Sequence, residues 1–327
     1  MDRRQLVTMG VAATGAWLAP SLWAQGRYPN RTVRLIVPFA PAGSTDMLGR
    51  KLAARLGTLL EQTIVVDNKA GAAGVLGCVE AARAPADGYT LLLGTTGTHA
   101  INPSTMVKPS YDAVKDFAPI ALVGTQPFSL AVHPSVPAHT LPELLALLRA
   151  KPGKYDYATA GAGGIAHLSA ELFKKLGGVE MTHIPYKGGG PALQDVLAGH
   201  VSILSDSFST TLPQHRLGTL RVIAMTGERR SPVAPDIPTA AESGMPGFVS
   251  STAGILFAPA RTPRPVIDAI QRALARLMTD PMFLKEIEEG LLIEPATDST
   301  PEKTAEFIAN EIAKWAPIIK STGTRME

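Results

Sequence analysis

Strand-like and helix-like hydrophobic patterns alternate through the first third of the chain. Leucines at positions 48, 52, 56 and 59 recur on one face of a helix. The apolar runs on either side of them, rich in Val, Ile and Leu, have the length and composition of strands. We expect strands at 32–39, 63–67 and 89–96 and helices at 46–62 and 74–84. This β-α-β-α-β order predicts a parallel sheet covered by helices.

The same alternation returns in the middle of the chain, which predicts a second α/β unit. The patterns indicate helices at 141–150, 165–176 and 190–199 and strands at 155–160, 181–185, 201–206 and 220–226. Further helical patterns near the C-terminus occupy 264–279, 281–289 and 301–320.

Two extended apolar runs, 118–133 and 251–259, separate these units and are uncharged apart from His133 at the end of the first. We expect them to be strands that cross between two lobes. Lobe one would comprise residues 25–125 and 250–327, with the C-terminal helices completing it, and lobe two residues 126–249. Two crossing strands make a hinge, and a cleft between lobes is where α/β sheets bind ligands.

Residues 1–24 have the features of an export signal. Arg3 and Arg4 form a basic start, and the apolar run 6–20 is shorter than a comfortable membrane span. Ala24 supplies a small residue before a cleavage site, so we expect export to the periplasm by the Sec or the twin-arginine route. A retained N-terminal anchor is the alternative interpretation.

Charge and composition argue against several classes of partner. The 327 residues carry a net charge of +3, and the basic residues are scattered, so no stripe suits a nucleic-acid backbone. The single cysteine, Cys78, excludes an internal disulfide and a multi-cysteine metal site. Because the seven histidines are also spread along the chain, we expect no metal site.

A glycine-rich turn joins the strand at 155–160 to the helix at 165–176. This arrangement points the free N–H groups of a helix start at an anion. The spacing Gly161-x-Gly163-x-x-Ala166 approaches the dinucleotide fingerprint, but that fingerprint needs an acid where the next strand ends in Tyr186-Lys187. We therefore expect no cofactor. A small oxyanion such as a carboxylate fits the turn, and a purely structural turn is the alternative.

Two further loops, 38–48 and 94–103, each come directly after an expected strand, and both are rich in small hydroxyl side chains. Loops at the C-terminal ends of strands should converge on one cleft. Nucleophile-elbow, phosphate-loop and zinc-protease signatures are absent from the sequence. We expect His167 to orient the glycine turn rather than to act as a base.

These stretches resemble the Bug family of extracytoplasmic solute receptors, which are the substrate-binding proteins of tripartite tricarboxylate transporters. The resemblance covers nearly the whole chain after residue 24 and rests on "VPFAPAGSTD", "DGYTLLLGTTGTHAINP", "DFAPIALV", "YATAGAGGIAHLSAELF", "HIPYKGGGPALQDVLAGHV", "PDIPTAAESGMPGF" and "FAPARTP". It implies a two-lobed Venus-flytrap of the type II periplasmic binding protein class that captures a small carboxylate without a cofactor.

The resemblance also implies a set of ligand-binding residues and no catalytic ones. They are Phe39, Ala42, Gly43, Ser44, Thr45 and Asp46 in the first loop, Thr95, Thr96, Thr98 and His99 in the second, Thr159, Ala160, Gly161, Gly163 and Gly164 in the third, then His167 and Asp206. This chain departs from the family pattern at Ala42, Ala162, Gly164 and His200. The resemblance therefore does not name the acid.

The sequence thus predicts a monomeric periplasmic receptor that delivers its ligand to the membrane subunits of a tripartite tricarboxylate transporter or to a sensor. It would bind, close and release without making a bond. The rival hypothesis is a hydrolase on the same scaffold, with Ser44 or Thr98 as nucleophile and His99 as base. No acid stands at a defined spacing to orient such a base.

Overall fold

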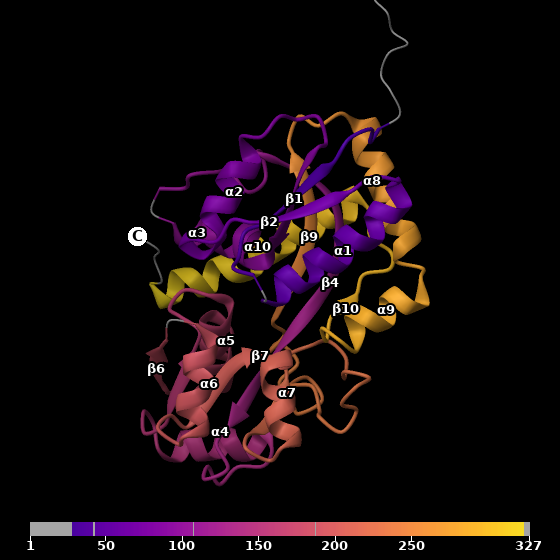
Figure 1. Cartoon of the computed structure of the whole chain (residues 1–327). Helices are drawn as coiled ribbons and strands as arrows, with labels where there is room; N and C mark the ends of the chain where they lie inside the picture. Colours follow the sequence, from indigo (N-terminus) through magenta and orange to yellow (C-terminus); the bar gives the residue numbers. More distant parts are fainter. Residues whose placement is uncertain (1–27, 42, 107, 187, 324–327) are drawn as a thin grey trace, which may run out of the picture.

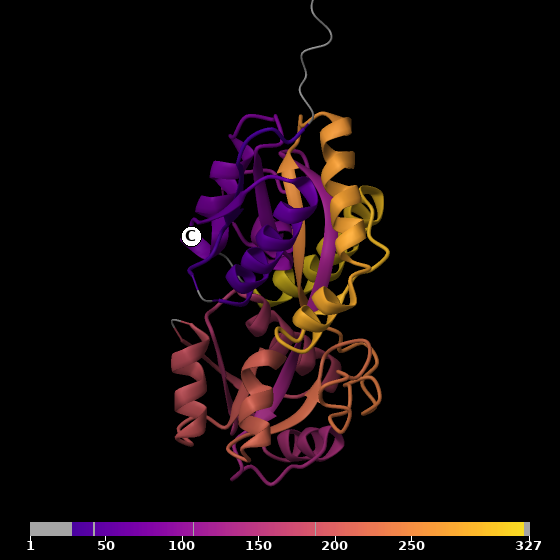
Figure 2. The ribbon, with the colours of Figure 1, turned by 45° about the vertical axis from the view of Figure 1, so that its right-hand side comes forward.

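The computed structural model describes residues 28–41, 43–106, 108–186 and 188–323. Two α/β lobes are stacked end to end and are joined by the long strand β4 (Phe117–Val132), which runs through both of them (Figure 1). Figure 2 shows the same stacking from a second direction. The two-lobed α/β fold predicted from the sequence is confirmed. Within the described residues, no helix combines the length and the apolar character needed to cross a membrane.

Lobe one is built on a sheet in the order β2-β1-β3-β9-β4. Its strands are β1 (Val33–Val37), β2 (Ile64–Asn68), β3 (Thr90–Thr95) and β9 (Ser251–Pro259), with β1 parallel to β2 and β3 and β9 antiparallel to β3. Successive side chains of a strand point to opposite faces. Leu35 and Val37 accordingly pack against one set of helices, whereas Ile36 packs on the other face. The first set is α1 (Ser44–Leu60), α8 (Arg264–Leu277) and α9 (Pro281–Glu288), and α2 (Val75–Ala82) covers the other face.

Lobe two repeats this plan on the last residues of β4. Its strands are β5 (Asp156–Thr159), β6 (Thr182–Pro185), β7 (Ile203–Ser207) and β8 (Arg221–Met225), and β5 is parallel to β6 and β7. The helices α4 (Leu141–Ala150) and α5 (Ile165–Gly177) contribute to one apolar cluster, and α6 (Gly189–Leu197) and α7 (Phe208–Arg216) to another.

Strand β4 changes partners where it leaves one lobe for the other. Up to Pro127 it pairs with β9, and from Phe128 onward it pairs with β7 and β8. A two-residue strand, β10 (Glu294–Pro295), adds to β4 on the lobe-one side of this change. We propose that the hinge lies here, in β4 and the start of β9, with lobe boundaries near 125 and 250.

The last helix, α10 (Pro301–Thr322), packs against both lobes. Ile308 joins an apolar cluster of lobe one, whereas Trp315 and Ile318 join the cluster that contains α4 and α5 of lobe two. The sequence pattern placed this helix wholly with lobe one. Because an amphipathic stripe does not say what it packs against, only the tertiary structure shows that the helix spans the junction.

The expected strands and helices are present with ends shifted by a few residues, and three helical regions were not expected. Helix α7 has Pro213 inside it and buries only a few apolar side chains, so its periodic signal is weak. The expected loop 94–103 contains a single π-helical turn at Gly97–Ile101, followed by α3 (Asn102–Thr105). A 3-10 turn at Ala72–Gly74 precedes α2.

Candidate functional site

A cavity of about 560 Å³ lies at the junction, with walls from both lobes. It is bounded by residues at or just after the C-terminal ends of β1, β3, β5 and β7, by Ala73 in the turn after β2, and by the strands β4 and β9. The predicted site residues that line it are Phe39, Gly43, Ser44, Thr45, Thr95, Ala160, Gly161, Gly163, Gly164 and Asp206. Convergence of the three loops on one cavity is therefore confirmed.

In lobe one, the start of helix α1 faces the cavity. Gly43 is the residue before the helix and has no side chain with which to cap it. The first N–H groups of a helix have no acceptor within the helix and carry a partial positive charge. With Gly43, Ser44 and Thr45 at the wall, these groups are placed to meet an anion. The predicted residue Ala42 lies outside the described residues.

Asp46 stands behind this loop and is absent from the cavity lining. Its carboxylate accepts hydrogen bonds from Arg50 Nε (3.0 Å) and Asn68 Nδ2 (2.9 Å). Asn68 also donates to the carbonyl oxygen of Phe39 at 3.0 Å. Because Asp46 is only 2% exposed, it is placed to support the loop through Asn68.

In the second predicted loop, some residues line the cavity and others support the loop from behind. Thr95 lines the cavity, whereas Thr96 accepts a hydrogen bond from the backbone N–H of Ala253 in β9 (3.0 Å). Thr98 Oγ1 accepts from the N–H of Thr95 (2.8 Å) and lies 2.9 Å from His99 Nδ1. The Thr96 contact ties the turn after β3 to β9, and the Thr98 contacts hold the shape of the turn itself.

His99 is fully buried in the core of lobe one. Its ring stacks on Phe257 with 3.9 Å between centroids, and burial lowers its pKa to about 3. Thr98 is equally buried, and neither side chain is part of the cavity wall. The Thr98–His99 contact required by the hydrolase hypothesis thus exists, but it has no access to a substrate.

In lobe two, the glycine turn and the start of α5 form the opposite wall. Gly163 has a φ of 79°, a left-handed conformation that favours glycine. The residue before the helix is Gly164, again without a capping side chain, and Ile165 and Ala166 of the first turn line the cavity. Both lobes therefore present an uncapped helix N-terminus to the same space.

Side chains behind this turn hold its shape. The N–H of Gly163 donates to His167 Nδ1 at 3.1 Å, which is the contact that the expected orienting role of His167 requires. Thr159 is fully buried and its hydroxyl donates to the carbonyl oxygen of Gly161 (3.0 Å). The same Oγ1 atom lies 2.7 Å from Nε2 of His183, a residue that the sequence analysis did not select.

Asp206 is the one acidic side chain in the described cavity lining, which contains no Lys, Arg or His. Its Oδ1 accepts from the N–H of Ser207 (2.6 Å), and its Oδ2 has no hydrogen-bond partner. Burial raises its pKa to about 6. An anion in this cavity would depend on backbone N–H groups and hydroxyls. Lys187, the basic residue near the turn in sequence, lies outside the described residues.

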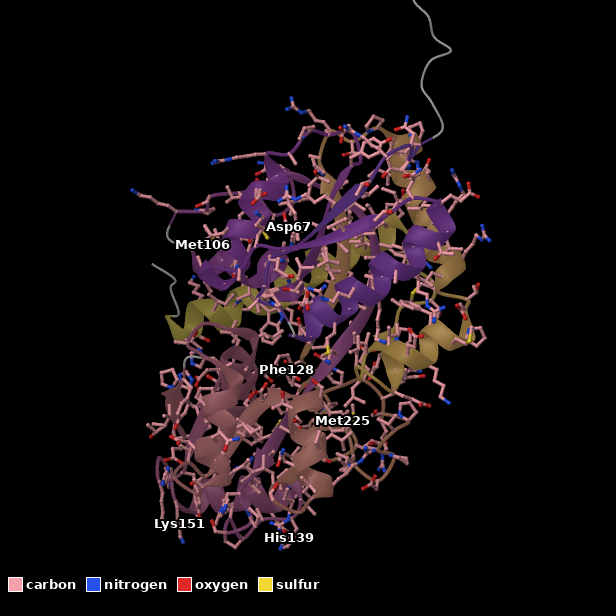
Figure 3. The ribbon with its side chains drawn as sticks, viewed as in Figure 1. Asp67, Met106, Phe128, His139, Lys151 and Met225 are labelled. Atoms are coloured by element: carbon pink, nitrogen blue, oxygen red, sulfur yellow. The ribbon has the colours of Figure 1, made fainter. Side chains whose placement is uncertain are left out.

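The wall also contains residues that were not among the predicted site residues. Gly97, Ile101, Asn102 and Ala162 lie inside the predicted loops, whereas Ala73, Gln126, Phe128, Ile165, Ala166, Ser207 and Thr252 lie outside them. Phe128 lies at the junction of the lobes in Figure 3. Gln126 carried a usable signal, because it is a lone amide in an apolar run, and its Nε2 donates to the carbonyl oxygen of Leu291 (2.5 Å).

Comparison with known proteins places this geometry in a family. The profile described as "Tripartite tricarboxylate transporter family receptor" matches residues 48–324. The chain is 36% identical to protein BugT of Bordetella pertussis over 327 residues, covering 99% of each chain.

Solved structures agree with this relationship. The R. palustris protein Rpa4515 with adipate has a TM-score of 0.81 and 34% identity, covering 91% of this chain and 99% of the other. The periplasmic binding protein BugD has a TM-score of 0.78 and 34% identity, covering 92% and 100%. These relatives are binding proteins rather than enzymes. The chain therefore belongs to the tripartite tricarboxylate transporter receptor family of periplasmic solute-binding proteins.

Proposed function

We propose that this protein captures a small carboxylate in the cavity between its lobes and closes around it. The observation that carries the proposal is the pair of uncapped helix N-termini, α1 from lobe one and α5 from lobe two, that face one cavity. Backbone N–H groups at a helix start offer directed donors and a partial positive charge, so no basic side chain is required. The adipate in the similar Rpa4515 structure supports a carboxylate of this size.

A ligand that touches both lobes stabilises the closed arrangement by its differential affinity for it. We infer that the closed receptor then delivers the acid to the membrane subunits of a tripartite tricarboxylate transporter, or to a sensor, and that it acts as a monomer. Residues 1–24, outside the described residues, would be removed after Ala24 on export to the periplasm.

Mass spectrometry of the small molecules released from the purified, denatured protein tests the ligand proposal. We expect an intact carboxylic acid that, when added back, raises the melting temperature. A panel of acids that includes adipate, hexanoate and 6-aminohexanoate extends the test. Release of a non-acid, together with no thermal shift from any acid in the panel, would overturn the proposal.

A further inference from the structure

Three aromatic rings are stacked beneath the glycine turn of lobe two. Tyr157 of β5 lies 4.8 Å from His183 of β6, and His183 lies 4.0 Å from His167 of α5, measured between ring centroids. The two imidazole planes differ by only 8°. Each imidazole also has a hydrogen-bond contact with the turn, His167 through Gly163 and His183 through Thr159. The proposed function uses the turn but not this stack.

The hydrogen bonds determine where each imidazole carries its proton. The Gly163 N–H donates to Nδ1 of His167, so that nitrogen is bare and the neutral ring is protonated at Nε2. The single hydroxyl proton of Thr159 is given to the carbonyl oxygen of Gly161. Because a carbonyl oxygen can only accept, we assign the hydroxyl proton to it, so that Oγ1 accepts from His183 and that ring carries its proton on Nε2.

The charged side chains near the stack, Glu171 and Lys174, form an ion pair with each other. On α5, Glu171 accepts hydrogen bonds from the Tyr157 hydroxyl (2.6 Å) and from Lys174 Nζ (2.9 Å). On β5 and β6, the groups that face the His167 imidazole are Tyr157 and His183. Burial lowers the pKa of His167, and burial followed by the neighbouring His167 lowers the pKa of His183 to about 4. The pair is therefore neutral at neutral pH.

We propose that His167 and His183 are positioning residues that hold the ligand-binding turn only while both are neutral, so that proton uptake by the pair releases the turn and weakens ligand binding. A proton on Nδ1 of His167 would turn an acceptor into a donor facing the N–H of Gly163. A proton on His183 would place a cation against the face of His167. The statement about affinity rests on the proposed function, whereas the statement about the turn does not.

The direction of the pH effect follows from the lowered pKa values. An unfolded histidine takes up a proton near pH 6.5. The folded pair does so at lower pH, so its contribution to folding stability is complete above about pH 6.5 and is lost as the pH falls toward 4. The turn should loosen in the same range, as the folded protein itself becomes protonated.

Nuclear magnetic resonance of glycine-labelled protein tests the turn without a ligand. The Gly163 amide signal is identified as the one missing from Gly163→Ala and is followed from pH 7.5 to 4. We expect it to titrate in the wild-type protein and to stay constant in His167→Asn, whose side-chain oxygen accepts the same bond but does not titrate. His139→Asn, at the far end of lobe two in Figure 3, is the matched control and should titrate like the wild type.

An unchanging wild-type Gly163 signal, or an equal titration in His167→Asn, overturns the proposal. For His183 the two variants are His183→Gln, which keeps an N–H donor for Thr159, and His183→Leu, which removes it. We expect the Gly163 amide at pH 7.5 to keep its wild-type shift in His183→Gln and to move in His183→Leu. Equal effects of the two would overturn the assigned role of His183.

Calorimetric titration with adipate provides the functional measurement. We expect wild-type affinity to fall a few-fold more than that of His167→Asn between pH 7.5 and 4. Because both proteins meet the same adipate and contain the same Asp206, the difference reports the histidine pair. A parallel loss in both proteins overturns the link to affinity. If adipate binds neither protein at any pH, the proposed function fails for this acid, and the Gly163 titration still decides the role of the pair.

Discussion

The cavity loops of lobe one and lobe two present the same device, a strand followed by a glycine-containing turn and an uncapped helix start, but different side chains support them. In lobe one, Asn68 bridges the Phe39 carbonyl and the Asp46 carboxylate. In lobe two, the support is a stack of rings that includes two titratable histidines. The comparison teaches that the same strand–turn–helix geometry can be supported either by an amide bridged to a carboxylate or by a stack that contains two imidazoles.

Backbone conformation separates the two loops further. Gly43 has a φ of −76°, which any residue adopts, whereas Gly163 has a φ of 79°. A Cβ atom at Gly43 would meet its nearest neighbour, the Ala40 carbonyl oxygen, at an ordinary 3.7 Å. Only the lobe-two turn therefore depends on glycine for its shape.

The largest expected effect is the loss of ligand binding in Gly163→Val. A β-branched residue is strained in the left-handed region, so the turn must change shape and its N–H groups move away from the ligand. Gly43→Ala is the control and should bind within a few-fold of the wild type. Calorimetry with the acid recovered from the protein checks both. Normal affinity in Gly163→Val would remove the lobe-two turn from the site.

Next in size is Asn68→Ala in the lobe-one support. The Phe39 carbonyl and the buried Asp46 carboxylate would each lose a donor, which costs on the order of 1–3 kcal/mol of folding free energy. We expect the affinity of Asn68→Ala for the ligand to be lower than that of the wild type, by the same factor at pH 7.5 and at pH 5.5. Denaturant unfolding and calorimetry at both values measure this. A strongly pH-dependent loss would contradict the contrast between the two supports.

A moderate effect is expected at Asp206, the titratable group in the cavity wall. Asp206→Ala should weaken hydroxy and amino acids, which can donate to the unpartnered Oδ2, more than plain acids of the same length. Competition between 6-aminohexanoate and hexanoate reports the difference. An equal loss for both acids would instead indicate a structural role.

The raised pKa of Asp206 also predicts that the folding stability of the ligand-free protein depends on pH. Its folded pKa of about 6 lies above the unfolded value of about 3.9, so its contribution to stability is complete below pH 3.9 and is lost as the pH rises through 6. Asp206→Asn should therefore raise the melting temperature at pH 7.5 more than at pH 4.5. An equal rise at both values would show that the Asp206 carboxyl does not titrate in this range.

The smallest expected signal is the compaction that brings the two loops together. If the lobes close about β4 and the start of β9, saturating ligand should slightly reduce the radius of gyration measured by small-angle X-ray scattering. Asn30→Ala, remote from the hinge on lobe one, should compact like the wild type. A radius that saturating ligand leaves unchanged would mean that lobe closure is not the mechanism.

Local sequence patterns were enough to establish the alternation of strands and helices, the two-lobed arrangement and the positions of the three loops. They suffice because apolar periodicity and glycine-containing turns report on neighbours along the chain. Gly163 was part of the pattern that predicted the turn, and its φ in the structure is one that favours glycine.

Which side chains of those loops reach the cavity became clear only from the packing of the folded chain. Thr98 and His99 have the composition of a binding loop, yet they face the core. Asn68 of β2 and His183 of β6, which were not among the predicted site residues, support the loops from behind. The direction of a side chain depends on how its element packs against others. The contacts that fix this direction join residues far apart in the chain, as Phe39 and Asn68 are, and no local pattern records them.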